Sequence, residues 1–237
     1  MKLYRLNKEV LSFQNKAGEF LKGLTSNDLD QPKNAFLNIH GRIIATFEQM
    51  YFPSGTVKDP LGACARLEDC ALPDQETCWV ILEKPFVRLV QKHLARYLTL
   101  SPVRMTVLKK CVYWDCASDQ MVLSDRVLPE EVSDDDFAWY RLTHGMPVQG
   151  VDYTDEFVLN VSETDYVSFS KGCFLGQEPV AKVRNRSRPS RKLVVKFEED
   201  CSAEEKAAMT SVARDPETGR PAGFVFVWNT EKKEETS

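Results

Sequence analysis

The sequence predicts an α+β fold in which helices and strands are mixed along one chain. Helix-like and strand-like runs alternate over its 237 residues without an internal repeat. Apolar residues make up 43% of the chain, an ordinary fraction for a globular protein. This length allows one sizeable domain and a small appendage, and we therefore expect a hydrophobic core.

The N-terminal part predicts one strand and two helices. Tyr4 to Phe13 favours an opening strand, and a helix is predicted around Glu19 to Leu24, whose apolar residues share one face. A longer helix is predicted to begin at Pro85, because proline is tolerated at the first helical position. Its apolar stripe comprises Phe86, Leu89, Val90, Leu94, Tyr97 and Leu98. Such stripes are typical of helices that pack on a core.

A third helix is predicted after the acidic run from Glu130 to Asp136. Ser133 is the expected N-cap, and Gly145 is the expected stop. Carboxylates in a first turn interact favourably with the positive end of the helix dipole. The acidic run therefore has a structural explanation and does not indicate a ligand site.

The pattern becomes β-rich beyond Arg188. Leu193 to Phe197 and Phe224 to Trp228 predict strands. Ser202 followed by Glu205 predicts a capped short helix between them. We place a domain boundary near residue 190. The predicted segments are a main domain of residues 1–190, a short β-rich domain of residues 191–230 and a disordered polar tail of residues 231–237.

Composition and charge argue against two classes of partner. The net charge of -4 and the pI of about 5.6 argue against a protein that wraps nucleic acid, because phosphate binding needs clustered positive charge. No run approaches the roughly 18 apolar residues of a membrane span, and the N-terminus lacks the apolar stretch of a signal peptide. We expect a soluble chain that binds neither nucleic acid nor membrane.

Cysteine usage points to a reducing compartment. The seven cysteines form an odd set, which argues against a disulfide framework. No CxxC motif occurs, and the histidines His40, His93 and His144 are scattered. We therefore expect reduced thiols and no preformed metal site.

The chemically most informative segment surrounds Cys173. Gly172 and Gly176 permit backbone angles closed to other residues and let a ligand approach closely. The Lys171 ammonium favours the thiolate if it turns toward the sulfur. From the residues alone, Cys173 is either a nucleophile or metal ligand on a loop, or a buried thiol beside a tight turn.

This segment resembles the folate-binding YgfZ family, relatives of the glycine-cleavage T-protein. Lys171 to Glu178 read KGCFLGQE, against KGCYxGQE in the family, so Phe174 replaces the usual tyrosine. Other stretches resemble the family in the expected order: FLKGLTSNDL (Phe20–Leu29), FLNIHGRIIATFEQM (Phe36–Met50) and WYRLTHGMPVQGVD (Trp139–Asp152). Thr210 to Val227 resembles a fragment of the family's C-terminal barrel, although the chain is short for a full barrel.

The resemblance implies a fold and a function. The implied fold is a GcvT/YgfZ-like ring of α+β subdomains around a central hole for tetrahydrofolate, with a small, truncated β-barrel-like domain at the C-terminus. The implied function is that of a tetrahydrofolate-binding accessory protein that supports iron–sulfur cluster assembly or repair. The implied partners are folate and iron–sulfur client or assembly proteins. A monomer in the cytoplasm, or in the mitochondrial matrix of a eukaryote, is expected.

The resemblance also implies which residues carry activity. Cys173 and Lys171 are the expected catalytic residues, and Gln177 and Glu178 are expected to shape the ligand-binding loop. One cysteine cannot hold a cluster alone. Any iron–sulfur cluster at Cys173 is therefore expected to be transient and shared with a partner.

Four folate contacts are predicted, each with a structural alternative. Asn27 and Asp28 would bond the donors of a pterin edge, or they cap a turn. Phe137 or Trp139 would stack on the pterin or aminobenzoyl ring, or it packs in the core.

Three arginines are predicted to hold anionic groups. Arg42 would hold a folate carboxylate, and Arg141 would do so or make a structural ion pair. Arg184 belongs to a basic run, Lys182 to Arg188, that an extended chain would place on one face. That ridge would face the polyglutamate tail of folate or an acidic partner, or it is a strand edge protected by charge.

Two other functions stay open at this stage: a folate-dependent aminomethyl or methyl transferase, and a non-catalytic interaction module on the same scaffold. Where the T-protein carries an acidic pair, this chain has Ala45 and Thr46. One-carbon transfer needs a group that aligns and polarises the reacting amine. The absence of that acid favours the accessory protein over the transferase.

Overall fold

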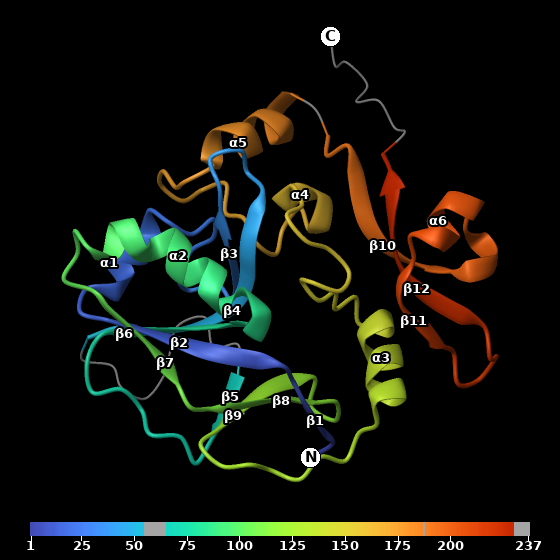
Figure 1. The fold of residues 1–237 in the computed structure, drawn as a ribbon, viewed down its shortest axis with the longest axis horizontal. Helices are drawn as coiled ribbons and strands as arrows, with labels where there is room; N and C mark the ends of the chain where they lie inside the picture. Colours follow the sequence, from blue (N-terminus) through green and yellow to red (C-terminus); the bar gives the residue numbers. More distant parts are fainter. Residues whose placement is uncertain (55–64, 187, 230–237) are drawn as a thin grey trace.

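The main sheet of the computed structural model has five antiparallel strands in the order β3-β4-β6-β2-β7 (Figure 1). The structure describes residues 1–54, 65–186 and 188–229. The strands are β2 (Lys8–Gln14), β3 (Lys33–Leu37), β4 (Ile43–Phe52), β6 (Thr77–Glu83) and β7 (Arg104–Leu108). Because side chains alternate along a strand, the sheet presents two faces that both need cover.

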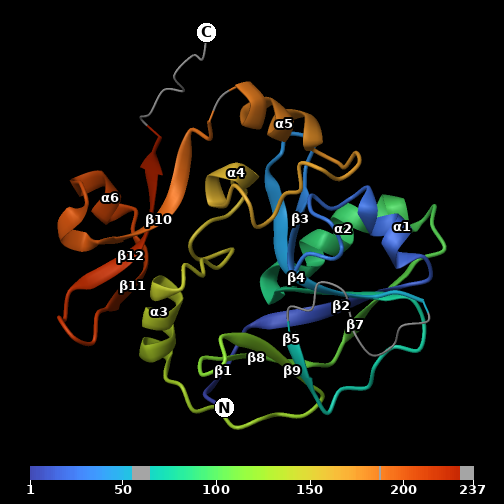
Figure 2. The same ribbon diagram turned by 180° about the vertical axis from the view of Figure 1, so that it is seen from behind.

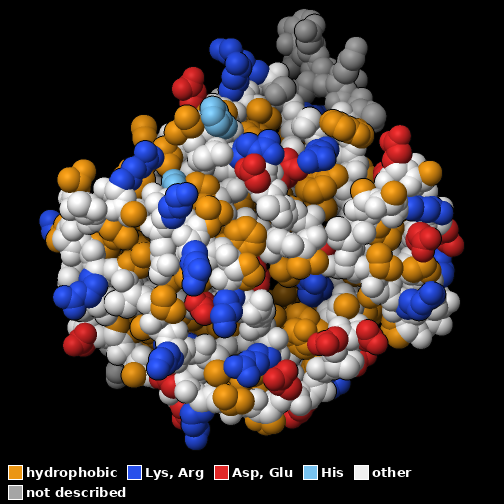
Figure 3. Space-filling model, viewed as in Figure 1, with side chains coloured by type: hydrophobic (Ala, Val, Ile, Leu, Met, Phe, Trp, Pro, Cys, Tyr) orange, Lys and Arg blue, Asp and Glu red, His pale blue; other side chains and the backbone are white. Residues whose placement is uncertain are grey.

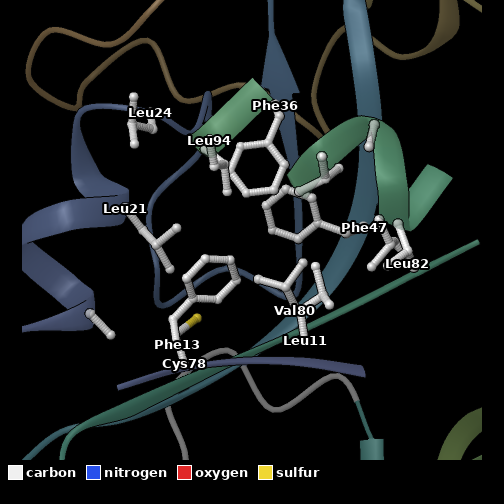
Figure 4. Packing of buried hydrophobic residues seen from close by; sticks show 14 of the residues in the cluster. Leu11, Phe13, Leu21, Leu24, Phe36, Phe47, Cys78, Val80, Leu82 and Leu94 are labelled. Carbon is white, nitrogen blue, oxygen red and sulfur yellow. The ribbon is translucent and has the colours of Figure 1, made fainter. Parts of the chain in front are cut away.

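Two helices cover one face of this sheet, α1 (Ala17–Lys22) and α2 (Val87–Leu98). Figure 4 shows the buried side chains between these layers, among them Phe13, Phe36, Phe47, Leu21 and Leu94. Each apolar side chain of this size contributes roughly 1.5–3 kcal/mol when it is fully buried. The predicted apolar stripe of α2 packs on the core except at Leu89, which is 46% exposed. The helix begins two residues after the predicted start, because Pro85 lies in the 3₁₀ turn η1 (Lys84–Phe86) that leads into it.

A second sheet, in the order β1-β8-β9-β5, packs on the other face of the main sheet. Val10, Trp79 and Ile81 of the main sheet contact Val112 and Leu123 of the second sheet. The strands are β1 (Leu3–Arg5), β5 (Ala65–Glu68), β8 (Cys111–Asp115) and β9 (Gln120–Ser124). Only the β5–β9 pair is parallel among the described strands, so the mixed, largely antiparallel architecture agrees with the predicted α+β class.

The predicted opening strand from Tyr4 to Phe13 is two strands rather than one. The chain leaves the second sheet after β1 and enters the main sheet at Lys8, because β1 pairs with β8 whereas β2 pairs with β6. Leu6 and Asn7 make this crossing. The N-terminus thus ties the two sheets together.

The helix α3 (Asp134–Thr143) lies between these sheets and the C-terminal sheet, as both views show (Figures 1 and 2). Ser133 is its N-cap, with the amide of Asp136 donating to Ser133 Oγ at 3.2 Å. Gly145 follows the helix with a positive φ of 59°, as a helix stop requires. Both predicted ends of this helix are confirmed within one or two residues.

The C-terminal sheet has three antiparallel strands in the order β10-β12-β11. They are β10 (Arg191–Phe197), β11 (Thr210–Arg214) and β12 (Pro221–Trp228). The short helix α6 (Ala203–Ala207), preceded by the 3₁₀ turn η2 (Glu198–Asp200), has the predicted capping box of Ser202 and Glu205. Leu142 of α3 packs against Ala222 and Phe224 of this sheet.

The observed C-terminal sheet differs from the barrel-like domain that the resemblance implied. Within the described residues it is open, since β10 and β11 each pair only with β12. It begins at Arg191, beside the predicted boundary, but the division of the chain into separate domains stays a prediction. The predicted tail, 231–237, lies outside the described residues, as does Cys64.

The basic run from Lys182 to Arg188 is not an extended ridge. Residues Gln177–Arg186 form the helix α5, in which successive side chains are about 100° apart. Lys182 and Arg186 therefore share one face, whereas Arg184 points elsewhere. The remaining helix is α4 (Val158–Val161). No helix in the described ranges is long and apolar enough to cross a bilayer.

Candidate functional site

A central cavity of about 460 Å³ lies where the two N-terminal sheets, α3 and the loops around α4 meet. Figure 3 shows a hollow near the middle of the molecule, between these layers. Its volume is within the range of about 300–1,000 Å³ typical of small-molecule sites. Charged side chains in its lining are Lys8, Lys33, Glu48, Glu83, Asp119, Arg141 and Asp165. Aromatic side chains in its lining are Trp114, Phe137 and Tyr166.

Lys8 and two glutamates form a charged group in the cavity wall. Lys8 Nζ lies 3.0 Å from Glu48 Oε2 and 2.9 Å from Glu83 Oε1, and each of the three side chains is at most 22% exposed. Burial lowers the pKa of the Lys8 ammonium, but the two carboxylates outweigh burial and raise this pKa above its ordinary value. One cation between two anions leaves an excess of negative charge and carboxylate oxygens that can accept further hydrogen bonds.

A stack of aromatic rings runs along α3, and two of them, Phe137 and His144, line the cavity. Phe137 is 5% exposed, lines the cavity and stacks on Tyr4 at 3.8 Å between ring centroids. The stack continues through Tyr140 to His144, whose rings are also 3.8 Å apart. The Tyr140 hydroxyl donates to Asp119 at 2.5 Å, and burial together with this bond raises the pKa of Tyr140 to about 12. Trp139 instead packs toward the C-terminal sheet, so of the two predicted aromatic contacts only Phe137 lines the cavity.

Arg141 lines the cavity and also makes a structural ion pair. Its guanidinium donates to the carboxylate of Asp152, whose side chain is fully buried. The same carboxylate accepts hydrogen bonds from the hydroxyls of Thr210 and Ser211 at 2.8 and 2.6 Å. This network joins α3 to β11. The position of Arg141 is compatible with both of its predicted roles, contact with a ligand and a structural ion pair.

Asn27 is a buried structural residue behind the cavity wall. Its side-chain amide donates to the carbonyls of Lys33 and Asp165, both at 3.0 Å. The backbone N–H of Asn27 donates to Asn34 Oδ1 at 2.6 Å. Lys33 and Asp165 line the cavity and are paired at 3.0 Å. Asn27 thus supports the wall without lining the cavity, and Asp28 beside it does not line the cavity either.

Lys171 connects the cysteine loop to this wall. Its ammonium donates to the carbonyls of Thr25 and Asn27 at 2.6 and 2.8 Å. Burial lowers the pKa of Lys171 to about 8, and the nearby Lys22 adds to this effect while Asp28 opposes it. The ammonium therefore anchors the loop on backbone carbonyls.

Cys173 is exposed on that loop, which excludes the alternative of a buried thiol. Gly176 has a positive φ of 85°, and a Cβ at this position would lie 2.4 Å from the Asn38 carbonyl oxygen. Only glycine fits this close approach. Gly172 differs, since a Cβ there would meet no atom within 4 Å. The predicted need for glycine is thus confirmed at Gly176 alone.

The remaining predicted site residues lie on the surface beside the loop or away from it. Gln177 and Glu178 form the first turn of α5, and Arg184 on the same helix lies 3.8 Å from Glu163. Arg42 pairs with Asp155 at 3.2 Å in an exposed position. None of these four predicted residues lines the central cavity.

The structure therefore separates the predicted site into two parts. Phe137 and Arg141 line the cavity, whereas Lys171 and Cys173 belong to a loop that Asn27 joins to the cavity wall. Sequence reasoning missed the cavity group of Lys8, Glu48 and Glu83. The signal that could have found it is a charged residue in each of three strands that also carry buried apolar residues. Within the described ranges, no three His, Cys, Asp or Glu side chains are grouped as metal ligands.

Fold and cavity together define a class of protein with mixed α and β layers around a central, ligand-sized hollow. The fold is similar to that of an aminomethyltransferase. A solved structure, the glycine cleavage system aminomethyltransferase T from Bartonella henselae, matches with a TM-score of 0.66 and 14% sequence identity, over 95% of this chain and 78% of that chain. This confirms the GcvT-like fold. No protein-family model and no curated protein matches the sequence.

Proposed function

We propose that this chain is a YgfZ-like accessory protein that binds a reduced folate in the central cavity and supports iron–sulfur cluster assembly or repair through Cys173. The observation that carries the proposal is the placement of the KGCFLGQE loop. Its cysteine is exposed, and its lysine is hydrogen-bonded to Asn27, which in turn holds Lys33 and Asp165 of the cavity wall. Ligand site and thiol are thus parts of one connected structure.

The cavity residues fit a folate by their chemistry. A pterin is planar and aromatic, and the cavity lining includes the aromatic side chains of Trp114, Phe137 and Tyr166. Its amino-pyrimidinone edge carries adjacent N–H donors, and carboxylates such as Glu48 and Glu83 accept donors of this kind. A reduced folate, when bound, supplies a carrier for one-carbon units. The residues of this chain would orient it and exclude water from its rings.

Cys173 and Lys171 have different roles in this proposal. The Cys173 thiol, exposed to a partner, would act as a transient ligand or sulfur nucleophile for a cluster that the partner also holds. Lys171 would position the loop through its bonds to the Thr25 and Asn27 carbonyls. An isolated cysteine cannot retain a cluster, so the cluster is cargo and not a resident group.

A folate-dependent transferase is the second candidate, favoured by the similarity of the fold to aminomethyltransferase T. Ala45 and Thr46 stand where the T-protein carries an acidic pair, and of these two Thr46 has the polar side chain. Its hydroxyl is bonded to Tyr153 at 2.7 Å and its amide to Gln149 at 2.8 Å. A buried hydroxyl with these partners cannot replace a carboxylate as a base, so the site supports binding better than transfer.

The proposed function is tested by complementation of a strain that lacks its own YgfZ-like protein. The readout is the activity of an enzyme that depends on an iron–sulfur cluster. Cys173→Ser should lose most of the rescue, whereas Cys111→Ser should retain it. Protein levels of both variants are compared in the same extracts. Full rescue by Cys173→Ser would reject the role of the thiol. Turnover of a methylated amine that depends on tetrahydrofolate would favour the transferase.

A further inference from the structure

The stretch of chain that carries Cys173 begins in the wall of the central cavity. Residues 162–176 connect α4 to α5 without a helix or a strand, and we call them the cysteine segment (Figure 1). Ser162, Asp165 and Tyr166 of this segment line the cavity, whereas Cys173 is exposed near its other end. Irregular connections of this length inside a compact fold are commonly functional.

A second stretch, residues 23–27, is hydrogen-bonded along the cysteine segment in antiparallel order. At the cavity end, the side-chain amide of Asn27 donates to the Asp165 carbonyl at 3.0 Å. The next bond runs from Ser26 Oγ to the Tyr166 carbonyl at 2.6 Å. Residues 23–27 therefore hold the backbone of two residues that line the cavity.

Three further bonds continue this row toward the thiol. The donors and acceptors are the Ser168 amide and the Ser26 carbonyl at 3.0 Å, the Lys171 ammonium and the Thr25 carbonyl at 2.6 Å, and the Leu175 amide and the Gly23 carbonyl at 3.0 Å. The partners recede along residues 23–27 as the cysteine segment advances. The row of bonds thus runs from the cavity wall to both sides of Cys173.

The two hydrogen-bonded stretches differ in how firmly the core holds them. Thr25 and Ser26 are fully buried, and the Ser26 amide also donates to the Ala35 carbonyl of β3 at 3.0 Å. The cysteine segment is exposed over much of its length, and its buried residues are Tyr166, Val167 and Phe174. Segments with few buried contacts open locally at a low free-energy cost. We therefore expect the cysteine segment to open while residues 23–27 stay in place.

We propose that a ligand in the central cavity holds the cysteine segment in its hydrogen-bonded state and thereby controls the position of Cys173. A ligand that fills the cavity contacts Asp165 and Tyr166, and the site is complete only while the segment is bonded to residues 23–27. Binding therefore favours the bonded state over the open one. The inference deepens the proposed function, on which it rests for the identity of the ligand, by giving the folate a regulatory role at the thiol.

Amide hydrogen exchange, followed for single residues by NMR, measures the opening of the cysteine segment. The Ser168 and Leu175 amides report on its middle and on its cysteine end. With 5-formyltetrahydrofolate at about 100 times its dissociation constant, exchange of both amides should slow by about 10- to 100-fold. The Gly219 amide, bonded to the Asp215 carbonyl in the turn between β11 and β12, should keep its rate. An unchanged rate at Leu175 in the ligand-bound protein would overturn the inference.

The coupling must also act from the cysteine end toward the cavity, because coupling between two sites is reciprocal. Lys171 does not line the cavity, yet Lys171→Met should weaken binding of 5-formyltetrahydrofolate by about 5-fold or more. Lys22→Met removes a neighbouring exposed cation that is not part of the row of bonds, and it should keep the affinity. Equal affinities of wild type and Lys171→Met would contradict the inference.

Asp165→Asn tests the connection without a ligand. It removes the ion pair with Lys33 in the cavity wall, at 3.0 Å, and should accelerate exchange at Leu175 by about 2- to 5-fold. Glu68→Gln, which removes a similarly exposed pair with Arg66 in the second sheet, should leave that rate unchanged. Equal rates at Leu175 in Asp165→Asn and wild type would reject the connection. Absence of folate binding to wild type would instead reject the proposed function, and the Asp165→Asn result would then decide the connection alone.

Discussion

The Lys171 ammonium donates a hydrogen bond to the carbonyl oxygen of Asn27 at 2.8 Å, and thereby joins the cysteine loop to the wall of the central cavity. Asn27 extends the connection, because its side-chain amide bonds the backbones of Lys33 and Asp165. The cavity and the thiol are therefore linked by three hydrogen bonds.

Replacing Lys171 should change how stability depends on pH. Burial lowers its folded-state pKa to about 8, below the ordinary value of about 10.4, so the folded state binds fewer protons between these pH values. The contribution of Lys171 to the free energy of unfolding must then rise with pH in this window, and it is lowest below pH 8. The difference in free energy of unfolding between wild type and Lys171→Met, measured with urea, should shift in favour of wild type from pH 8 to pH 10. Parallel curves for wild type and Lys171→Met would contradict the lowered pKa.

Gly176→Ala should destabilise the protein, whereas Gly172→Ala should not. The added methyl group at Gly176 would have to occupy a positive φ and approach the Asn38 carbonyl. Strain of this kind is worth about 1–3 kcal/mol. A Cβ at Gly172 meets open space, so the matched substitution should change the free energy of unfolding by less than about 0.5 kcal/mol. Equal effects of the two substitutions would show that the close approach is absent.

Lys8→Met should destabilise the protein strongly. It would leave Glu48 and Glu83 facing each other without their cation, with little solvent to screen them. Removing one partner from a buried ion group costs about 3–5 kcal/mol. Lys16→Met, which removes an exposed pair with Glu19, should cost no more than about 1 kcal/mol. Partial recovery of stability in Lys8→Met/Glu48→Gln would show that charge repulsion is the cause, and no recovery would argue for lost packing.

Arg141→Met should loosen the C-terminal sheet. The buried carboxylate of Asp152 would lose its cation while it still accepts bonds from β11. Amide hydrogen exchange should accelerate in β11 and β12 by on the order of 10-fold or more, and much less in β3. Equal acceleration throughout the chain would show that Arg141 stabilises the fold globally and not this junction.

Local signals in the sequence predicted local structure well. The caps at Ser133 and Ser202 were predictable because an N-cap and its partner lie three residues apart. The GcvT-like fold was predicted from a resemblance, and the solved structure of aminomethyltransferase T confirms it. The open C-terminal sheet was not predicted, because strand pairing over long sequence distances is not visible in a local pattern.

Two errors have physical explanations. Alternating cations from Lys182 onward suggested an extended chain, but the acid in the first turn and the arginines in the last turn match the dipole of a helix. The sequence analysis did not predict the cavity group, because Lys8, Glu48 and Glu83 come from three strands that only the folded sheet brings together.

The most direct test of the account is titration of the purified chain with 5-formyltetrahydrofolate by calorimetry, for wild type and Met146→Trp. Met146 lines the cavity, and an indole at this position would fill part of its volume. A folate site in the cavity predicts saturable one-to-one binding to wild type and at least about 10-fold weaker binding to Met146→Trp. Binding to Leu100→Trp, whose position is 91% exposed, should be unchanged. Absence of binding to wild type, or equal affinity for all three proteins, would contradict a folate site in the central cavity.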